Sequence, residues 1–148
     1  ACCDIAIGAE DARFSLSEVK LGLVPATISP YVIGAIGLRQ TRRLFVTGEV
    51  FDATCAARIG LLHEAVPAAQ LDDSVQRIIG TIEKTGPIAR REAKRLALHM
   101  AGMDERGASR LDTDNAELIA HLRVSDEGQE GLGAFLEKRK PNWITDNS

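Results

Sequence analysis

The sequence has 148 residues, of which 45% are hydrophobic and 26% are charged, and its formal net charge is −3. This is enough apolar material for one ordinary domain. The small negative charge argues against nucleic acid or a membrane surface as a partner, and we find neither a signal peptide nor an apolar run long enough to span a bilayer.

The first part of the chain alternates short strands, turns and short helices. Two strands, 4–7 and 13–16, are predicted around a polar turn at 8–11. Helices are predicted at 30–36, ending near Gly37, and at 40–46, ending at Gly48. Asp52 is a good N-cap for a helix over 53–59 that Gly60 ends, and residues 61–66 then form a strand closed by Pro67. This order suits the late turns of an α/β spiral.

After Pro67 the pattern becomes helical. Apolar residues with one-face spacing predict an amphipathic helix over about 71–84, and Gly86-Pro87 breaks it and starts another that reaches Met100. Further helices are predicted at about 104–124 and from Ser125-Asp126 to before Pro141. Four consecutive helices with several apolar faces usually pack against a further surface as well as against one another.

The stretch from Arg13 to Pro30 organises the rest of the chain. It begins as an alternating strand, and a single carboxylate, Glu18, follows before an apolar passage that we expect to be buried: Val19, Leu21, Leu23 and Val24. A carboxylate between a strand and an apolar segment is poorly solvated, which suits proton transfer. Local sequence alone, however, favours a surface glutamate at a strand end.

The three cysteines, Cys2, Cys3 and Cys55, do not suggest a disulfide framework. We expect them to be small buried hydrophobes in a reducing cytoplasm. The three histidines lie on separate predicted elements with no cysteine or carboxylate at ligand spacing, so no metal site is predicted.

A resemblance to a known family rests on blocks in matching order. The run Cys3-Asp4-Ile5-Ala6-Ile7-Gly8-Ala9, followed by Glu18-Val19-Lys20-Leu21-Gly22-Leu23-Val24-Pro25, resembles the signature of the crotonase (enoyl-CoA hydratase/isomerase) superfamily. Blocks within 44–67 and at 126–141 continue the likeness. It therefore covers essentially the whole chain.

The resemblance implies an α/β fold: the C-terminal part of a ββα spiral of the crotonase (ClpP-like) type over residues 1–67, then a helical trimerisation and CoA-binding region over residues 68–148. Members form homotrimers or dimers of trimers. Measured against the family, the chain begins just after a glycine-rich turn. The portion before that turn carries the oxyanion N–H donors and, where present, a first catalytic glutamate, so this chain alone is expected to be incomplete.

Four positions match family site residues. Glu18 matches the glutamate that acts as acid and base when water adds to the 2,3 double bond of an acyl-CoA thioester. Ala26 matches a position whose N–H helps hold the water. Phe135 and Lys138 match positions that meet the adenine and the 3′-phosphate of coenzyme A, usually from a neighbouring subunit. Coenzyme A enters as part of the substrate, and no permanently bound cofactor is implied.

The substrate and the reaction both leave alternatives. The loop from Ala26 to Tyr31 departs from the usual glycine-rich run and resembles hydratases for branched glutaconyl-CoA compounds from leucine or acyclic-terpenoid degradation. Their second carboxylate would suit Ser29 or the arginines at 39, 42 and 43, although a solvated helix face explains the arginines equally well. Rivals to the hydratase are a Δ3,Δ2-enoyl-CoA isomerase, an acyl-CoA thioesterase, and a non-catalytic CoA-binding or oligomerisation module.

Overall fold

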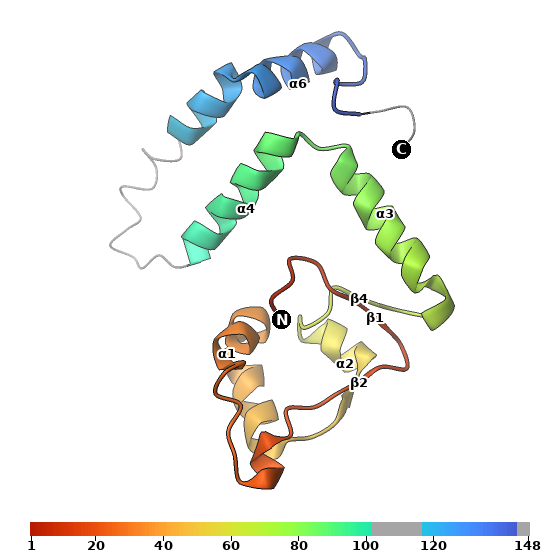
Figure 1. The fold of residues 1–148 in the computed structure, drawn as a ribbon, viewed down its shortest axis with the longest axis vertical. Coiled ribbons are helices and arrows are strands. Elements are labelled where there is room, and N and C mark those ends of the chain that lie inside the picture. The colour runs from red at the N-terminus through yellow and green to blue at the C-terminus, as the bar shows by residue number, and fades with distance from the viewer. Residues whose placement is uncertain (102–116, 145–148) are drawn as a thin grey trace. The chain divides into compact units, whose positions relative to one another are not determined.

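A computed structural model describes residues 1–101 and 117–144 (Figure 1). The chain forms two compact units, Ala1–Arg77 and Ile78–Ser148. The described residues are mostly helical, and the predicted spiral is represented by two two-stranded sheets. In this part of the chain, no helix is both long enough and apolar enough to cross a membrane.

The strands predicted at 13–16 and 61–66 are shorter than expected, the one predicted at 4–7 lies at 7–9 instead, and a strand at 51–52 was not predicted. β1 (Ile7–Ala9) pairs in parallel with β4 (Glu64–Val66), beside which it lies in Figure 1, and β2 (Arg13–Phe14) pairs antiparallel with β3 (Phe51–Asp52). The β1–β4 ladder does not extend back to residue 4, because a side chain takes over the pairing at Ala6. The Ala6 N–H donates to His63 Nδ1 (3.1 Å), while the Ala6 carbonyl accepts from the His63 N–H (2.7 Å).

The helices of this unit begin and end close to the predicted positions. α1 (Ser29–Thr47) is interrupted at Gly37, whose φ of 74° and ψ of 161° are not helical, so the two predicted helices are confirmed as two segments across a kink. Asp52 caps α2 (Ala53–Arg58) by accepting from the Cys55 N–H at 2.7 Å. Gly60 follows α2 with a φ of 87°, which a glycine adopts without the steric cost of a Cβ.

The core of the first unit lies between α1, α2 and the strands. Its buried members are Val32, Ile36, Leu44, Phe51, Ala53, Ala56 and Leu62. The Phe14 and Phe51 rings stack with centroids 5.7 Å apart, which joins β2 to β3. Thr41 is buried within α1, and its hydroxyl donates to the Gly37 carbonyl at the kink (2.8 Å).

Two predictions of burial are wrong. Leu21, Leu23 and Val24 are 78%, 61% and 73% exposed, because they belong to or follow a single 3-10 turn, η1 (Glu18–Leu21), that Gly22 ends. One short turn cannot bury residues on all its sides. Cys2 and Cys3 are exposed as well, because they precede the first strand and no element covers them within the described chain.

The C-terminal helices follow the predicted pattern where they are described. α3 spans Leu71–Glu83 after a short turn, η2 (Ala68–Gln70); α4 spans Pro87–Ala101; and α6 spans Asp126–Leu136, with Ser125 as its N-cap. Residues 117–124 are helical, and the rest of the helix predicted from 104 lies outside the described residues.

A carboxylate from α6 joins it to α4. Glu127 accepts from the N–H groups of Ile88 (2.7 Å) and Ala89 (2.6 Å) and so caps the first turn of α4. The negative charge also suits the positive end of the helix dipole. This cap fixes α6, the helix that carries the predicted CoA contact Phe135, against α4.

Candidate functional site

Glu18 begins η1 and carries an unusual oxygen. Its side chain is half-buried, and within the described part of the chain its Oε2 atom is fully buried and has no hydrogen-bond partner. Most buried polar atoms in proteins are paired, because leaving one unpaired costs on the order of 1–3 kcal/mol. Within the described residues, therefore, no group of the chain competes for this carboxylate oxygen.

The backbone around Glu18 is held tightly although its carboxylate is not. The Glu18 carbonyl accepts from the Leu23 N–H at 3.0 Å, and the Ser17 carbonyl accepts from the Lys20 N–H at 2.9 Å. Gly22 ends the turn in the left-handed region, with a φ of 71°. The acid is therefore presented on a closed turn and not on an extended loop.

Ala26 lies on the same connection, in an exposed turn before α1. Its N–H donates to the Val24 carbonyl (2.8 Å), and its carbonyl accepts from the Ser29 hydroxyl (2.8 Å). For Ala26 to hold a water, its N–H would have to share or exchange the bond to Val24. The water-holding role stays a prediction.

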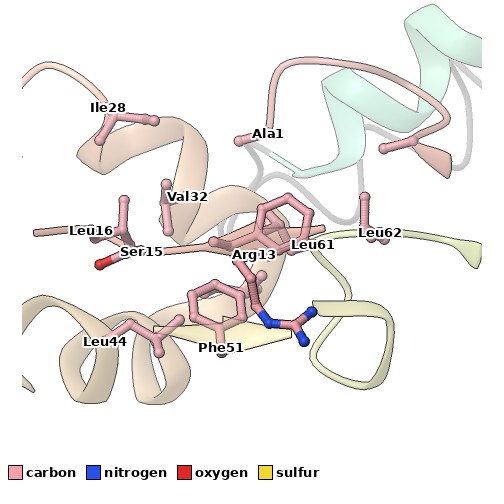
Figure 2. A pocket seen from close by; sticks show the side chains of 13 residues that line it. Ala1, Arg13, Ser15, Leu16, Ile28, Val32, Leu44, Phe51, Leu61 and Leu62 are labelled. Carbon is pink, nitrogen blue, oxygen red and sulfur yellow. The ribbon is translucent and has the colours of Figure 1, made fainter. Parts of the chain in front are cut away.

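An apolar hollow of about 390 Å³ opens beside this connection (Figure 2). Its lining includes Leu16 and Ile28, which lie on either side of the segment that carries Glu18 and Ala26, together with core residues such as Val32 and Phe51. Neither Glu18 nor Ala26 lines the hollow. In Figure 2 the Arg13 side chain stands beside the Phe51 ring, and its guanidinium is tied to the carbonyls of Asp11 and Ala12.

A second hollow, of about 410 Å³, lies on the outer face of α1 among Arg39, Arg42, Arg43, Val46 and Thr47. Arg43 donates to both carboxylate oxygens of Glu49, at 2.8 and 3.2 Å, which lowers the pKa of that carboxyl group. Among the described residues, Arg39 and Arg42 have no ion-pair partner. These are two of the three arginines that the sequence offers as possible partners of a substrate carboxylate, and their exposure also fits the solvated helix face that the sequence favours.

The predicted CoA contacts lie at the end of α6. Phe135 is 80% exposed, so it is not part of the core of the described chain. Lys138 is exposed and has a φ of 54°. It occupies the left-handed position of a Schellman motif, in which the Lys138 N–H donates to Phe135 O and the Arg139 N–H donates to Ala134 O. A lysine here accepts strain that glycine would avoid.

Sequence reasoning missed a charged network that holds the segment after α6. Arg139 donates to both oxygens of Glu130, at 2.6 and 2.9 Å, and to Glu137 at 2.7 Å. Glu130 also accepts from the Asn142 N–H at 2.8 Å. Arg139 is thus engaged within the chain. The only feature of the sequence that indicates this ion pair is the opposite charge of residues 130 and 139.

The network predicts a pH dependence for the segment after α6. Arg139, followed by the Asn142 N–H, lowers the pKa of Glu130 from 4.5 to about 2. A carboxyl group with a lowered folded-state pKa stabilises the fold above its unfolded pKa and loses that contribution as the pH falls through the folded value. We therefore expect the fluorescence of the single tryptophan, Trp143, to stay constant down to about pH 4.5 and to change between there and about pH 2. Glu130→Gln should remove this transition; a transition that persists in the variant would contradict the assignment.

One of the three histidines has a structural explanation. His63 accepts from the Ala6 N–H and continues a strand pairing. In the described ranges, no three histidine, cysteine, aspartate or glutamate side chains are grouped as a metal would require.

Comparison with known proteins identifies the relatives of the chain. The family model described as Enoyl-CoA hydratase/isomerase matches residues 1–146. A crotonyl-CoA hydratase of Syntrophomonas wolfei is 33% identical over 97% of this chain and 55% of its own length. A mevalonyl-coenzyme A hydratase of Aspergillus fumigatus is 31% identical over 95% of this chain and 52% of its own.

Solved structures agree with these relatives. The crystal structure of an enoyl-CoA hydratase from Shewanella pealeana is 45% identical, with a TM-score of 0.86 over 96% of this chain and 52% of that one. The chain therefore spans about half the length of the relatives it matches. Relatives of nearly equal identity are named for different acyl groups, so identity alone does not assign the acyl group here.

Proposed function

Because this chain belongs to the enoyl-CoA hydratase/isomerase family, we propose that it contributes to an enzyme that adds water across the 2,3 double bond of a 2-enoyl-CoA thioester. The observation that carries the proposal is the buried, unpartnered Oε2 of Glu18, at the position that resembles the acid/base glutamate of the family. Such an oxygen can accept a proton from a bound water.

In the proposed reaction, the Glu18 carboxylate removes a proton from water as the water oxygen bonds to carbon 3. The electron pair of the double bond moves toward the thioester carbonyl, and carbon 2 then receives from Glu18 the proton that its carboxylate took from the water, which restores the carboxylate. Negative charge on the thioester oxygen needs preorganised N–H donors, and each such donor is worth about 10²–10³ in rate. In the family that this chain resembles, these donors lie outside the part that the chain matches. We therefore expect turnover to require N–H donors from that part.

We further propose that Phe135 and Lys138 hold the coenzyme A part of the substrate across a subunit boundary. An exposed phenyl ring offers a face for the adenine, and an exposed ammonium suits a phosphate. A homotrimer or a dimer of trimers would bring these residues to a neighbouring site. The exposed apolar side chains of the helical region, which include Leu98, Ile119 and Val124, support such an assembly.

Product analysis tests the reaction. The natural polypeptide, expressed in full, is given crotonyl-CoA in ¹⁸O-labelled water, and the products are identified by mass spectrometry. One labelled oxygen in a 3-hydroxyacyl-CoA supports hydration. A shifted double bond without label would favour the isomerase, and release of free coenzyme A would favour the thioesterase. Binding of acyl-CoA with no product would favour the non-catalytic module.

For the acyl group, we propose a branched glutaconyl-CoA compound, whose second carboxylate Arg39 and Arg42 would receive. Replacing both arginines with glutamine should raise KM for 3-methylglutaconyl-CoA about tenfold, because a hydrogen bond to a charged group is worth about 1.5–3 kcal/mol. KM for crotonyl-CoA, which has no second carboxylate, should not change. Arg58→Gln, an exposed arginine on α2, is the control, and equal effects on both substrates would reject the proposal.

A further inference from the structure

We propose that Gly48 and Ser15 form a bracket that positions Glu18, a role that rests on the proposed function of that carboxylate. Gly48 follows α1, and Ser15 lies three positions before Glu18 in the sequence. Sequence reasoning assigned Gly48 only the end of a helix. The structure adds contacts on both sides of this glycine.

Gly48 is tied to the core. Its N–H donates to the carbonyl of Leu44 at 3.0 Å, and the Leu44 side chain is only 2% exposed. The hydroxyl of the preceding residue, Thr47, donates to the Arg43 carbonyl (2.9 Å). Gly48 therefore has a defined place relative to α1.

The segment that carries Glu18 rests directly on this glycine. A Cβ added to Gly48 would lie 3.0 Å from Val19 Cγ2, 3.3 Å from Lys20 Cε and 3.5 Å from the Leu16 carbonyl oxygen. Two of these neighbours follow Glu18 directly in the same 3-10 turn. A larger residue fits at position 48 only if the Val19 and Lys20 side chains, which follow Glu18 in that turn, give way by a few tenths of an ångström.

Ser15 closes the bracket from the other side. Its hydroxyl donates to the Gly48 carbonyl at 3.2 Å, across 33 positions of sequence. The segment before Glu18 and the turn that begins at Glu18 thus both contact Gly48. Within the described part of the chain, no side chain hydrogen-bonds to the buried Oε2 of Glu18. The position of this oxygen therefore depends on the backbone that the bracket holds.

The test compares two glycine substitutions with similar backbone cost. Gly48→Ala and Gly60→Ala each place a Cβ on a residue with positive φ after a helix, at 55° and 87°. Among the described residues, however, the Cβ at Gly60 would meet only the Ala35 carbonyl oxygen, at 3.4 Å. We expect Gly48→Ala to lower kcat for crotonyl-CoA hydration about tenfold with KM unchanged, because small displacements of a catalytic group reduce the rate steeply. Gly60→Ala should leave kcat unchanged.

Ser15 variants give a second test that does not strain the backbone. Ser15→Ala should lower kcat without changing KM, and Ser15→Thr, which keeps the hydroxyl, should restore it. If kcat of Gly48→Ala equals that of Gly60→Ala, or if Ser15→Thr behaves like Ser15→Ala, the bracket is wrong.

Nuclear magnetic resonance separates this failure from failure of the proposed function. The Glu18 amide resonance should shift in Gly48→Ala and stay in place in Gly60→Ala, whether or not the protein turns over. A Glu18→Gln variant with full activity would overturn the role of Glu18 and, with it, the catalytic meaning of the bracket. An unshifted Glu18 amide in Gly48→Ala would overturn the bracket alone.

Discussion

Glu18→Gln is expected to lower the rate of crotonyl-CoA hydration about a thousandfold, within the range that positioned acid–base groups supply. The amide has nearly the shape of the carboxylate, so the turn from Glu18 to Leu21 should persist, but an amide cannot accept the proton from water. Substrate affinity should change little. The measurement is the steady-state loss of the conjugated double bond in the ultraviolet, together with the dissociation constant for crotonyl-CoA.

Glu10→Gln is the matched control. Glu10 is an exposed glutamate of the same unit, in the turn between β1 and β2, and its N–H holds the turn by donating to the Val66 carbonyl at 2.8 Å. Its side chain has no part in the proposed reaction, so this variant should keep full turnover. If Glu18→Gln and Glu10→Gln turn over equally fast, Glu18 is not the acid/base.

The features that the sequence predicted correctly in the first unit are local ones. Asp52 caps α2 because its side-chain oxygen can accept a hydrogen bond from the free N–H three residues later without any contact from the rest of the fold. Gly37 and Gly60 interrupt or end helices because their dihedral angles are costly for other residues. A pattern of a few residues contains all the information that such features need.

Burial and strand length failed because they depend on distant parts of the chain. Leu21, Leu23 and Val24 form an apolar run, but a run does not say what will cover it, and in this chain they are exposed. β1 is short because the side chain of His63, 57 positions away from Ala6, replaces a backbone acceptor. No local pattern around Ala6 contains that bond.

The candidate site shows the same difference between features that a local pattern predicts and features that depend on distant residues. Glu18 and Phe135 could be named only by resemblance, since composition and periodicity treat them as an ordinary acid and an ordinary aromatic residue. The Ser15–Gly48 hydrogen bond and the cap of Glu127 on α4 join residues 33 and 38–39 positions apart. Neither contact could be predicted before the elements were placed together.

Two phenylalanine substitutions are expected to separate stability from binding. Phe51→Ala should destabilise the first unit by about 3–5 kcal/mol, because it removes a large core side chain. Phe51 is 8% exposed and stacks on Phe14, so no water contact compensates for the loss. Hydrogen exchange of the α1 and α2 amides measures the change within this unit.

Phe135→Ala makes the same chemical change on an exposed ring. It should alter stability by no more than about 0.5 kcal/mol, as is usual for surface positions. If Phe135 stacks on the adenine, the loss of about 1 kcal/mol should raise KM for acyl-CoA substrates several-fold and leave kcat unchanged. Phe51→Ala and Phe135→Ala remove the same phenyl ring. If Phe135→Ala raises KM without faster hydrogen exchange, the contact that is lost therefore lies outside the fold of this chain. A KM equal to that of the unmodified protein would remove Phe135 from the binding site.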